Sequence, residues 1–256
     1  MTGPRRDKLP WHVLVHVLLR SFLIQASWNF ERLQNVGFMY VVAPALRFLY
    51  SEDELLKAYA RHMEYFNTHP YLSSTVIGTV LDLETKVANG TPEAVGIEEF
   101  KKMVMAPYAA MGDAFFWGGL RPLAACIALF FAAKGSLWAP VVFLVLFNLG
   151  HFFYRFYGIF HAYRLGVGVL QVIQRHHLPD LALKAKEATV VILGGLCAYL
   201  STLEFRHEDM TLVWGFLILP VVVFLSWLAR KGISVLLLVL AASVVMLMAG
   251  ELLGKG

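Results

Sequence analysis

The chain has 256 residues, of which 58% are hydrophobic and only 16% are charged. A soluble globular domain usually carries about 25% charged residues, so this composition excludes an ordinary soluble domain and indicates an integral membrane protein. The formal net charge of +4 does not indicate a nucleic-acid partner, because no run of Lys or Arg is longer than two residues. A basic cytoplasmic face of a membrane protein accounts for it better.

The apolar residues gather beyond Trp117, so we expect an all-α integral membrane protein with four parts. Residues 1–116 are expected to form amphipathic and polar helices with broken or re-entrant segments. A short or broken transmembrane hairpin follows at 117–165. A basic cytoplasmic loop is expected at 166–187, and C-terminal transmembrane helices at 188–256.

The first predicted helix begins at Trp11. Leu14, Leu18 and Phe22 follow Trp11 at helical spacing, which predicts an amphipathic helix that lies along the membrane face. The basic residues before it are typical of a signal peptide. Two histidines and an arginine interrupt the apolar run, however, so we do not expect a cleaved signal.

The segment 25–35 combines polar and aromatic side chains and is expected to be helical. Asn29 and Arg32 would then share one face. Glu31 and Gln34 would lie on another. Because a helix that is polar on two faces is seldom exposed to lipid, the segment is either an interfacial helix with local pairing of Glu31 or part of a polar binding site.

A capping-type start at Ser51 predicts a second polar helix, which should stop at Pro70 because proline cannot continue a helix. Asn67, Thr68 and His69 come directly before that proline. They either cap the end of the helix or meet a ligand, as polar side chains do where transporter helices are broken.

A third polar segment lies where the apolar region begins. Asp113 and Arg121 bracket an aromatic cluster that includes Trp117, and Pro122 is expected to interrupt regular helix there. Ionisable groups at membrane depth usually pair with each other or serve function. Asp113 therefore either pairs with Arg121 or contacts a polar ligand.

Two ordinary helices are expected at 71–88 and from Ile97 onward. The clearest membrane spans are Thr211–Ala229 and Ile233–Gly250, because each approaches the roughly 20 residues needed to cross the hydrocarbon core. The shorter run at 188–203 is expected to be a third span.

Charge sets the expected topology. The basic segment 155–187 should be cytoplasmic, which places the N-terminus in the cytoplasm and the acidic segment 204–209 outside. Cys126 and Cys197 lie in apolar runs, so no disulfide is expected. The sequence matches no common hydrolase, P-loop or zinc motif, and we expect no catalytic residue, metal or cofactor in this chain.

Four segments, in order, resemble the IID membrane component of mannose/fructose/sorbose-type sugar phosphotransferase systems. They are Arg20–Phe22 with Gln25–Asn35, Phe66–Leu72, Met105–Pro122 and Asn148–Tyr163. The resemblance covers roughly residues 12 to 165, and beyond Arg164 it is limited to hydropathy. The chain departs from the usual pattern inside these motifs at Tyr108, Ala114, Phe115 and Gly150-His151.

The resemblance implies a multi-pass protein of the bacterial inner membrane. With a IIC subunit it would bind and translocate a hexose-type sugar, which a phosphorylated IIB protein, supplied by IIA, phosphorylates during uptake. The pairs would assemble into a higher oligomer. A membrane interaction or signalling protein that senses sugar or phosphorylation state without transport is the alternative.

The same resemblance gives the polar clusters a role in sugar recognition. Buried sugar hydroxyls need hydrogen-bond partners, and the apolar face of a sugar ring can lie against an aromatic ring. The expected hydroxyl-binding residues are Asn67, His69, Asp113, Glu31 and Gln34. Trp28 and Trp117 are expected to cover the ring face.

Overall fold

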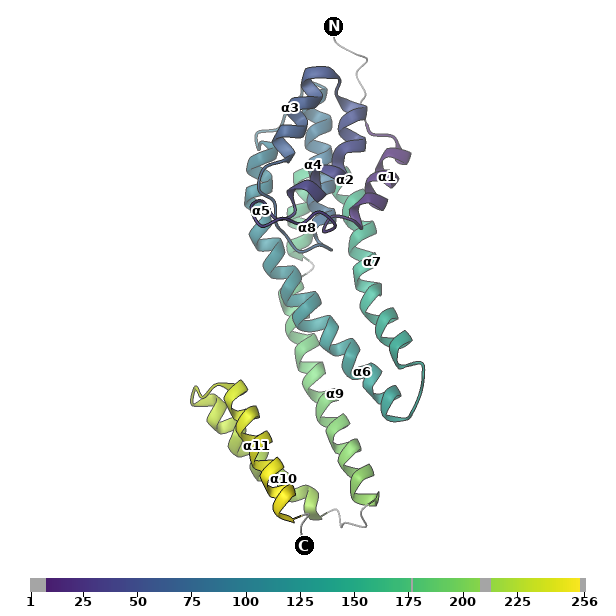
Figure 1. Ribbon diagram of the computed structural model, residues 1–256. Coiled ribbons are helices and arrows are strands. Elements are labelled where there is room, and N and C mark those ends of the chain that lie inside the picture. The colour runs from purple at the N-terminus through teal and green to yellow at the C-terminus, as the bar shows by residue number, and fades with distance from the viewer. Residues whose placement is uncertain (1–7, 176, 208–212, 254–256) are drawn as a thin grey trace. The chain divides into compact units, whose positions relative to one another are not determined.

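The computed structural model describes residues 8–175, 177–207 and 213–253 (Figure 1). Every regular element in these ranges is a helix, which confirms the all-α prediction. In chain order the elements are α1 (Trp11–Ser21), α2 (Asn35–Leu49), α3 (Glu52–His62), α4 (Ser73–Ala88), α5 (Ile97–Gly112), η1 (Asp113–Leu120), α6 (Arg121–Ala133), α7 (Ala139–Leu165), η2 (Gly166–Gly168), α8 (Val169–Arg175), α9 (Leu178–His207), α10 (Val213–Arg230) and α11 (Val235–Leu253).

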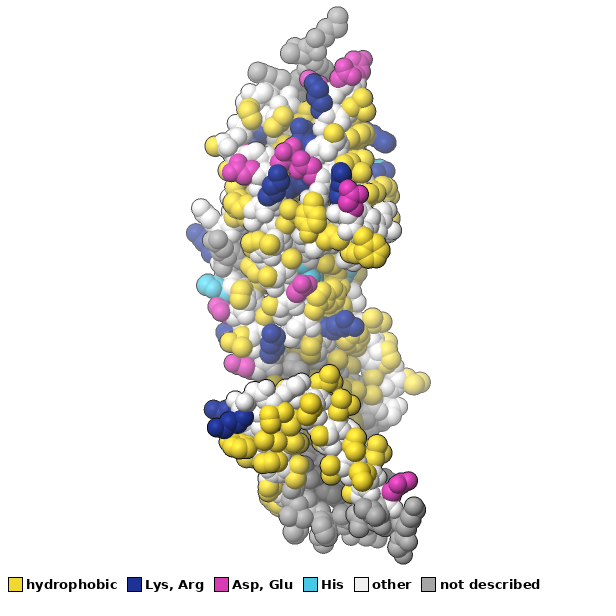
Figure 2. Space-filling model, turned by 60° about the vertical axis from the view of Figure 1, so that its left-hand side comes forward, with side chains coloured by type: hydrophobic (Ala, Val, Ile, Leu, Met, Phe, Trp, Pro, Cys, Tyr) yellow, Lys and Arg dark blue, Asp and Glu magenta, His cyan; other side chains and the backbone are white. Residues whose placement is uncertain are grey.

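The chain divides into two compact units, Met1–Gly194 and Gly195–Gly256. The second unit contains α10 and α11, which occupy the segments expected as the last two spans. A tight turn joins them, and Gly232 takes a φ of +94° there. Hydrophobic side chains cover the visible face of this hairpin, with Lys and Arg gathered at one end (Figure 2).

Two helices of the described ranges are long and apolar enough to cross a membrane. One is Ile97–Ala133, in which α5, η1 and α6 follow one another, and the other is Ala139–Val172. Gly135, with a φ of +71°, forms the turn between them. Apolar side chains on α7 stay exposed from Val141 to Phe156, as lipid contact requires.

Regular α-helix is interrupted next to Pro122, as predicted, although the chain stays helical through this position. The irregularity lies just before it, where η1 is a π-helix of eight residues. Proline lacks an N–H donor and its ring crowds the preceding turn, and the wider π turn accommodates both. Short π segments inside α-helices are frequent at functional sites.

The segment before α2 is a loop, and the helix predicted at 25–35 is wrong. We call residues 22–34 the first polar loop. Asn29 accepts a hydrogen bond from the backbone N–H of Arg32 at 2.8 Å and donates to Oδ1 of Asn35 at 2.8 Å. Side chains that bond to nearby backbone in this way compete with helix formation. Leu33 also has a positive φ of 55°.

The second polar helix ends at His62, earlier than the predicted stop at Pro70. Residues 63–72, which we call the central loop, pair with the first polar loop instead of continuing the helix. The N–H of Gln34 donates to the carbonyl of Phe66 at 2.8 Å, and the N–H of Phe66 donates to the carbonyl of Arg32 at 3.3 Å. Two segments that are far apart in sequence are thereby joined.

The basic segment predicted as a loop at 166–187 is largely helical, formed by η2, α8 and the start of α9. Its lysines, such as Lys184 and Lys186, lie exposed along α9, so a high density of basic residues does not require a loop. At the far end of α9, helix continues through His207. The rest of the predicted acidic loop lies outside the described residues.

Helix α4 forms the centre of the first unit and packs most extensively against α7. Glycines permit this close approach. A Cβ atom at Gly78 would lie 2.5 Å from the carbonyl oxygen of Ile159, and one at Gly158 would lie 2.5 Å from Oγ of Ser74. Because the central loop leads directly into α4, this packing also presses the loop against α7.

A buried ionic cluster ties α2, α3 and α4 together. The carboxylate of Glu84 is fully buried and accepts hydrogen bonds from Tyr50 Oη at 2.7 Å and from Arg61 Nε and Nη2, both at 2.9 Å. It also lies 2.7 Å from His62 Nε2. Desolvation favours the neutral carboxyl, but the hydrogen bonds from His62 and Arg61 outweigh it and lower the pKa of Glu84.

Candidate functional site

The central loop is held from one side by Gln34. Its side-chain Nε2 donates to the carbonyl oxygen of Thr68 at 2.9 Å, and its Oε1 accepts from the N–H of Thr68 at 3.0 Å. Gln34 is only 2% exposed. Both the nitrogen and the oxygen of the Gln34 side-chain amide are thus hydrogen-bonded to the backbone of Thr68. Gln34 therefore positions the loop that carries Asn67 and His69.

His69 lies at the centre of an aromatic cluster. Its ring stacks on Phe116 of η1 with centroids 4.9 Å apart and lies 5.1 Å from Trp117. The Nδ1 atom accepts from the N–H of Tyr71 at 3.3 Å. The Nε2 atom is buried and has no hydrogen-bond partner in the described part of the chain.

Burial, together with the nearby His151 and Arg155, lowers the pKa of His69 to about 4. At neutral pH the imidazole is therefore uncharged. Since Nδ1 acts as an acceptor, the proton resides on Nε2. His69 thus offers one buried N–H donor that the protein itself leaves unused.

The two buried histidines predict that acid destabilises the fold. Burial also lowers the pKa of His62, although Glu84 opposes this shift. Below about pH 6.5 the unfolded chain binds protons at His62 and His69 that the folded chain does not bind. The free energy of unfolding should then fall by up to about 1.4 kcal/mol per pH unit for each histidine.

Thermal unfolding of the detergent-purified protein between pH 7 and pH 5 measures this effect. His62→Asn should reduce the slope of the melting temperature against pH, whereas His12→Asn, at an exposed histidine of α1, should leave it unchanged. A melting temperature that is flat over this range in the unmodified protein would contradict the assignment.

Gly112, the last residue of α5, lets η1 approach the central loop. A Cβ atom at this position would lie 2.3 Å from both Cβ and Cγ of His69. Any side chain there would therefore displace the imidazole or the helix. The third polar segment is brought to His69 through this contact.

Helix α7 supplies the remaining wall. The ring of His151 stacks on Tyr71 with centroids 3.9 Å apart. Arg155 is 2% exposed and donates to the carbonyl oxygen of Pro70 at 3.1 Å and to Nε2 of His151 at 2.9 Å. It also donates to the carbonyl oxygen and the hydroxyl of Ser21, at the end of α1.

Sequence reasoning placed Arg155 in a cytoplasmic loop and did not select Tyr71, His151 or Arg155 as site residues. Arg155 instead lies within α7 and is buried, so the predicted loop at this position is wrong. One signal was available, because His151 and Arg155 are four residues apart on a mainly apolar helix. Polar side chains in such a helix usually pair or serve function.

Asp113 and Trp117 both lie on η1 with exposed surface. Asp113 is exposed, and within the described ranges no ion pair joins it to Arg121, so the structure does not favour that pairing. The guanidinium of Arg121 lies instead 5.8 Å from the ring of Trp117. Trp117 is 38% exposed and stacks with Phe147 of α7 at 6.0 Å.

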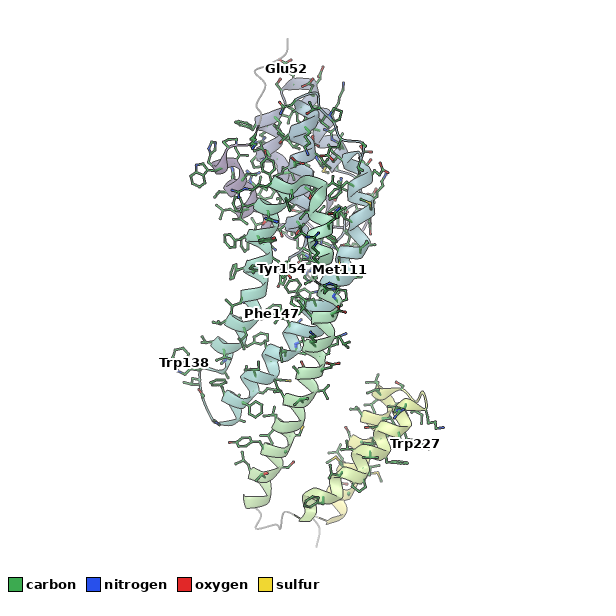
Figure 3. All side chains as sticks on the ribbon, turned by 180° about the vertical axis from the view of Figure 1, so that it is seen from behind. Glu52, Met111, Trp138, Phe147, Tyr154 and Trp227 are labelled. Atoms are coloured by element: carbon green, nitrogen blue, oxygen red, sulfur yellow. The ribbon has the colours of Figure 1, made fainter. Side chains whose placement is uncertain are left out.

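Figure 3 marks Phe147 and Tyr154 along α7 and Met111 near the end of α5.

Asn67 is partly exposed, and its N–H lies 3.4 Å from Sδ of Met105 on α5. The central loop thus carries Asn67 and His69, and η1, which contacts this loop, carries Asp113 and Trp117.

Trp28 and Glu31 lie elsewhere on the first polar loop. Trp28 is 46% exposed and meets Phe30 edge to face at 5.1 Å. Glu31 is exposed and pairs with Arg32 at 3.3 Å. No contact of the described residues joins either side chain to His69, so these two residues belong to a separate exposed surface.

Comparison with known proteins places this arrangement in one family. The model of the PTS system mannose/fructose/sorbose family IID component matches residues 8–254. The mannose-specific EIID component of Escherichia coli (strain K12) is 36% identical over 200 residues, which are 77% of this chain and 69% of that protein. The fructose permease IID component of Bacillus subtilis (strain 168) is 28% identical over 256 residues, covering 92% of this chain and 93% of that protein.

Solved structures support the same family assignment. A membrane-protein structure superposes with a TM-score of 0.76 at 31% identity, covering 96% of this chain and 98% of the other. A chain of the cryo-EM complex of the mannose transporter ManYZ with microcin E492 gives a TM-score of 0.61 at 30% identity, covering 97% and 98%. The chain belongs to the mannose/fructose/sorbose family of PTS IID components.

Proposed function

We propose that this chain forms a sugar-translocating unit with a IIC subunit. The unit binds a hexose-type sugar and carries it inward, and phosphorylated IIB, recharged by IIA, phosphorylates the sugar during uptake. The support is the family, together with relatives that are named for mannose, fructose and sorbose. The similar ManYZ structure is that of a mannose transporter, which favours transport over a purely signalling role.

One observation carries the assignment of the site. The four sequence segments that resemble the family meet at the central loop, through Gln34, His69, Gly112 and Arg155. Polar side chains in an apolar protein are costly unless they pair or serve function. Their convergence on a few residues therefore supports a binding site rather than scattered helix caps.

The chemistry suits a sugar. Removing sugar hydroxyls from water requires side chains that replace each lost hydrogen bond. The carboxylate of Asp113 accepts, the amide of Asn67 accepts and donates, and Nε2–H of His69 donates. The ring of Trp117 covers an apolar sugar face, as aromatic rings do with apolar ligand surfaces.

The other predicted residues take different roles in the proposal. Gln34 positions the central loop through its bonds to Thr68. Trp28 and Glu31, exposed on the first polar loop, are proposed to complete the site where the IIC subunit meets this chain. The phosphoryl group stays on IIB until transfer, and no nucleophile of this chain takes part.

The proposed location is the bacterial inner membrane, with the N-terminus in the cytoplasm and several IIC–IID pairs in one assembly. The two long apolar helices and the membrane-protein family support it. Coexpression with the neighbouring IIC subunit should allow both chains to be extracted together in detergent.

Asp113→Asn and Asn67→Ala should each raise the sugar concentration needed for half-maximal uptake by about tenfold, because each removes one hydrogen bond to a sugar hydroxyl. Uptake of labelled hexose would be measured in a strain that depends on this system. Immunoblots of the membrane fraction would show whether each variant is present at normal levels.

Glu99→Gln is the matched control for Asp113→Asn, because it neutralises an exposed carboxylate of α5 that lies outside the central loop and takes part in none of these contacts. It should leave uptake unchanged. Normal uptake by both site variants at normal membrane levels would remove Asp113 and Asn67 from the site.

A further inference from the structure

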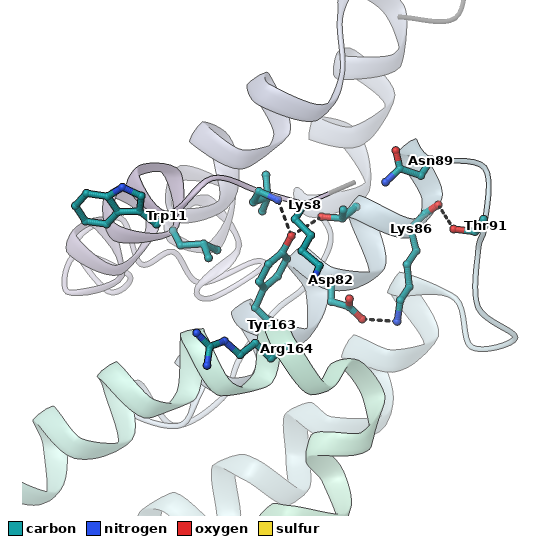
Figure 4. Close-up of a pocket in the computed structure, with 11 residues that line it drawn as sticks. Lys8, Trp11, Asp82, Lys86, Asn89, Thr91, Tyr163 and Arg164 are labelled. Atoms are coloured by element: carbon teal, nitrogen blue, oxygen red, sulfur yellow. Dashed lines mark hydrogen bonds and ion pairs between the residues drawn. The ribbon is translucent and has the colours of Figure 1, made fainter. Parts of the chain in front are cut away.

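A surface pocket of about 750 Å³ lies at the opposite end of α7 from the α6–α7 turn (Figure 4). Three segments line it: the start of α1 with the residues before it, the C-terminal half of α4 with the turn that follows, and the last turn of α7. None of its lining residues belongs to the proposed sugar site. The pocket therefore needs a separate explanation.

Its charge is predominantly positive. Lys8, Lys86 and Arg164 line the pocket, and Asp82 is the one carboxylate among the lining residues. Asp82 pairs with Lys86 at 2.7 Å, and Glu93 contacts Lys86 as well. Lys8 and Arg164 are exposed and form no ion pair within the described ranges, so their charges are free to bind an anion.

Tyr163 fixes the residues that carry this charge. Its hydroxyl accepts a hydrogen bond from the N–H of Leu9 at 2.7 Å and lies 3.4 Å from Oγ1 of Thr85. Both Tyr163 and Leu9 are buried. This contact holds Lys8 and Trp11, on either side of Leu9, close to Arg164.

The rim is apolar. Trp11 is 73% exposed, and Leu165, next to Arg164 on α7, is 42% exposed. Arg164 lies in the last turn of α7, beyond the exposed apolar residues that continue to Phe156. An exposed Trp beside basic residues at the end of such a helix is typical of the membrane–water interface.

We propose that this pocket binds the phosphate of an anionic phospholipid headgroup, with Lys8 and Arg164 as its ligands and Trp11 against the lipid's glycerol and upper acyl region. A soluble phosphate would meet the same two cations. It would gain nothing from the exposed apolar rim, which is why the lipid is favoured. Basic pockets beside membrane helices bind such headgroups in general.

The test uses the full chain copurified with its IIC subunit. Native mass spectrometry would measure binding of phosphatidylglycerol and of phosphatidylcholine with the same acyl chains. The Lys8→Gln/Arg164→Gln double variant should bind phosphatidylglycerol about 30-fold more weakly than the unmodified protein, since each cation near a membrane surface contributes about fivefold. Phosphatidylcholine carries the same phosphate, but its ammonium offsets the charge, so it should bind the unmodified protein more weakly and lose less affinity than phosphatidylglycerol in the double variant.

Lys57→Gln/Arg175→Gln is the matched control, because it removes the same charges from exposed positions outside the pocket. It should weaken phosphatidylglycerol binding less than threefold. Equal binding by both double variants would overturn the proposal.

Inorganic phosphate and a hexose 6-phosphate serve as competitors that separate the two sources of phosphate. The proposal predicts that neither displaces phosphatidylglycerol at equal concentration. If either one binds with the same dependence on Lys8 and Arg164 and displaces the lipid, the ligand is a soluble phosphate and the lipid assignment is wrong.

Discussion

Arg155→Met should nearly abolish sugar uptake and destabilise the protein by roughly 3 kcal/mol or more, because it removes all the charge-assisted hydrogen bonds that this buried guanidinium donates to neighbouring segments. The guanidinium reaches the carbonyl of Pro70, the end of α1 at Ser21 and the ring of His151. No other buried cation of the described chain joins these three elements. Thermal unfolding in detergent and uptake of labelled hexose measure both effects.

Arg155→Lys separates charge from geometry. An ammonium keeps the charge but cannot donate in the planar fork that reaches Ser21 and Pro70 together, so this variant should remain strongly impaired. Arg175→Met, at an exposed arginine of α8, should behave as the unmodified protein does. Full uptake and an unchanged melting temperature in Arg155→Met would show that the central loop does not depend on this residue.

Gly112→Ala should lower sugar uptake at least about 30-fold, although it adds a single methyl group. The new Cβ would lie 2.3 Å from two carbon atoms of His69, so the imidazole or η1 must move. Phe116, which stacks on His69, would move with them. The readout is hexose uptake normalised to the amount of protein in the membrane.

Gly194→Ala makes the same change at a glycine of α9 where a Cβ would meet no atom within 4 Å. It should leave uptake unchanged and stabilise the helix slightly, since alanine is the better helix former. If Gly112→Ala transported as well as Gly194→Ala, close packing of η1 on His69 would not be needed for function.

The sequence predicted the helical class because its signals are local. The apolar stretches of α10 and α11 and the amphipathic repeat of α1 can be recognised from composition and spacing alone. The predicted apolar face of α1 nevertheless differs in part from the face that is buried. Leu14 and Leu18 are buried, whereas Trp11 and Phe22 are exposed, because α1 packs on α2 and α7 through only part of its apolar surface.

Loops that are held by distant partners could not be predicted in this way. The central loop looks like the end of a helix in sequence, yet its backbone bonds to Arg32 and Gln34 replace the helical hydrogen bonds. The first polar loop is held by the same distant bonds, together with the local ones that Asn29 makes to Arg32 and Asn35. Such tertiary contacts override local helix propensity.

The candidate site was predictable in part. Polar residues in an apolar chain made His69 and Asp113 candidates, and both stay predictions. The structure adds that Gln34 positions the central loop and that Arg155 supports this loop from α7. The burial of Arg155 was missed because an arginine that follows an apolar stretch is usually placed at the cytoplasmic interface, although its helical spacing from His151 was a signal.

Binding of hexoses to the purified IIC–IID complex tests the central claim most directly. Labelled mannose, glucose, fructose and sorbose would each be titrated against the intact complex and against complexes that carry Asp113→Asn or Asn67→Ala. At least one hexose should bind saturably, and its binding should weaken about tenfold in each variant while the complex stays intact. An intact complex that binds no hexose, or binds it equally well in both variants, would show that Asp113 and Asn67 do not form a sugar site.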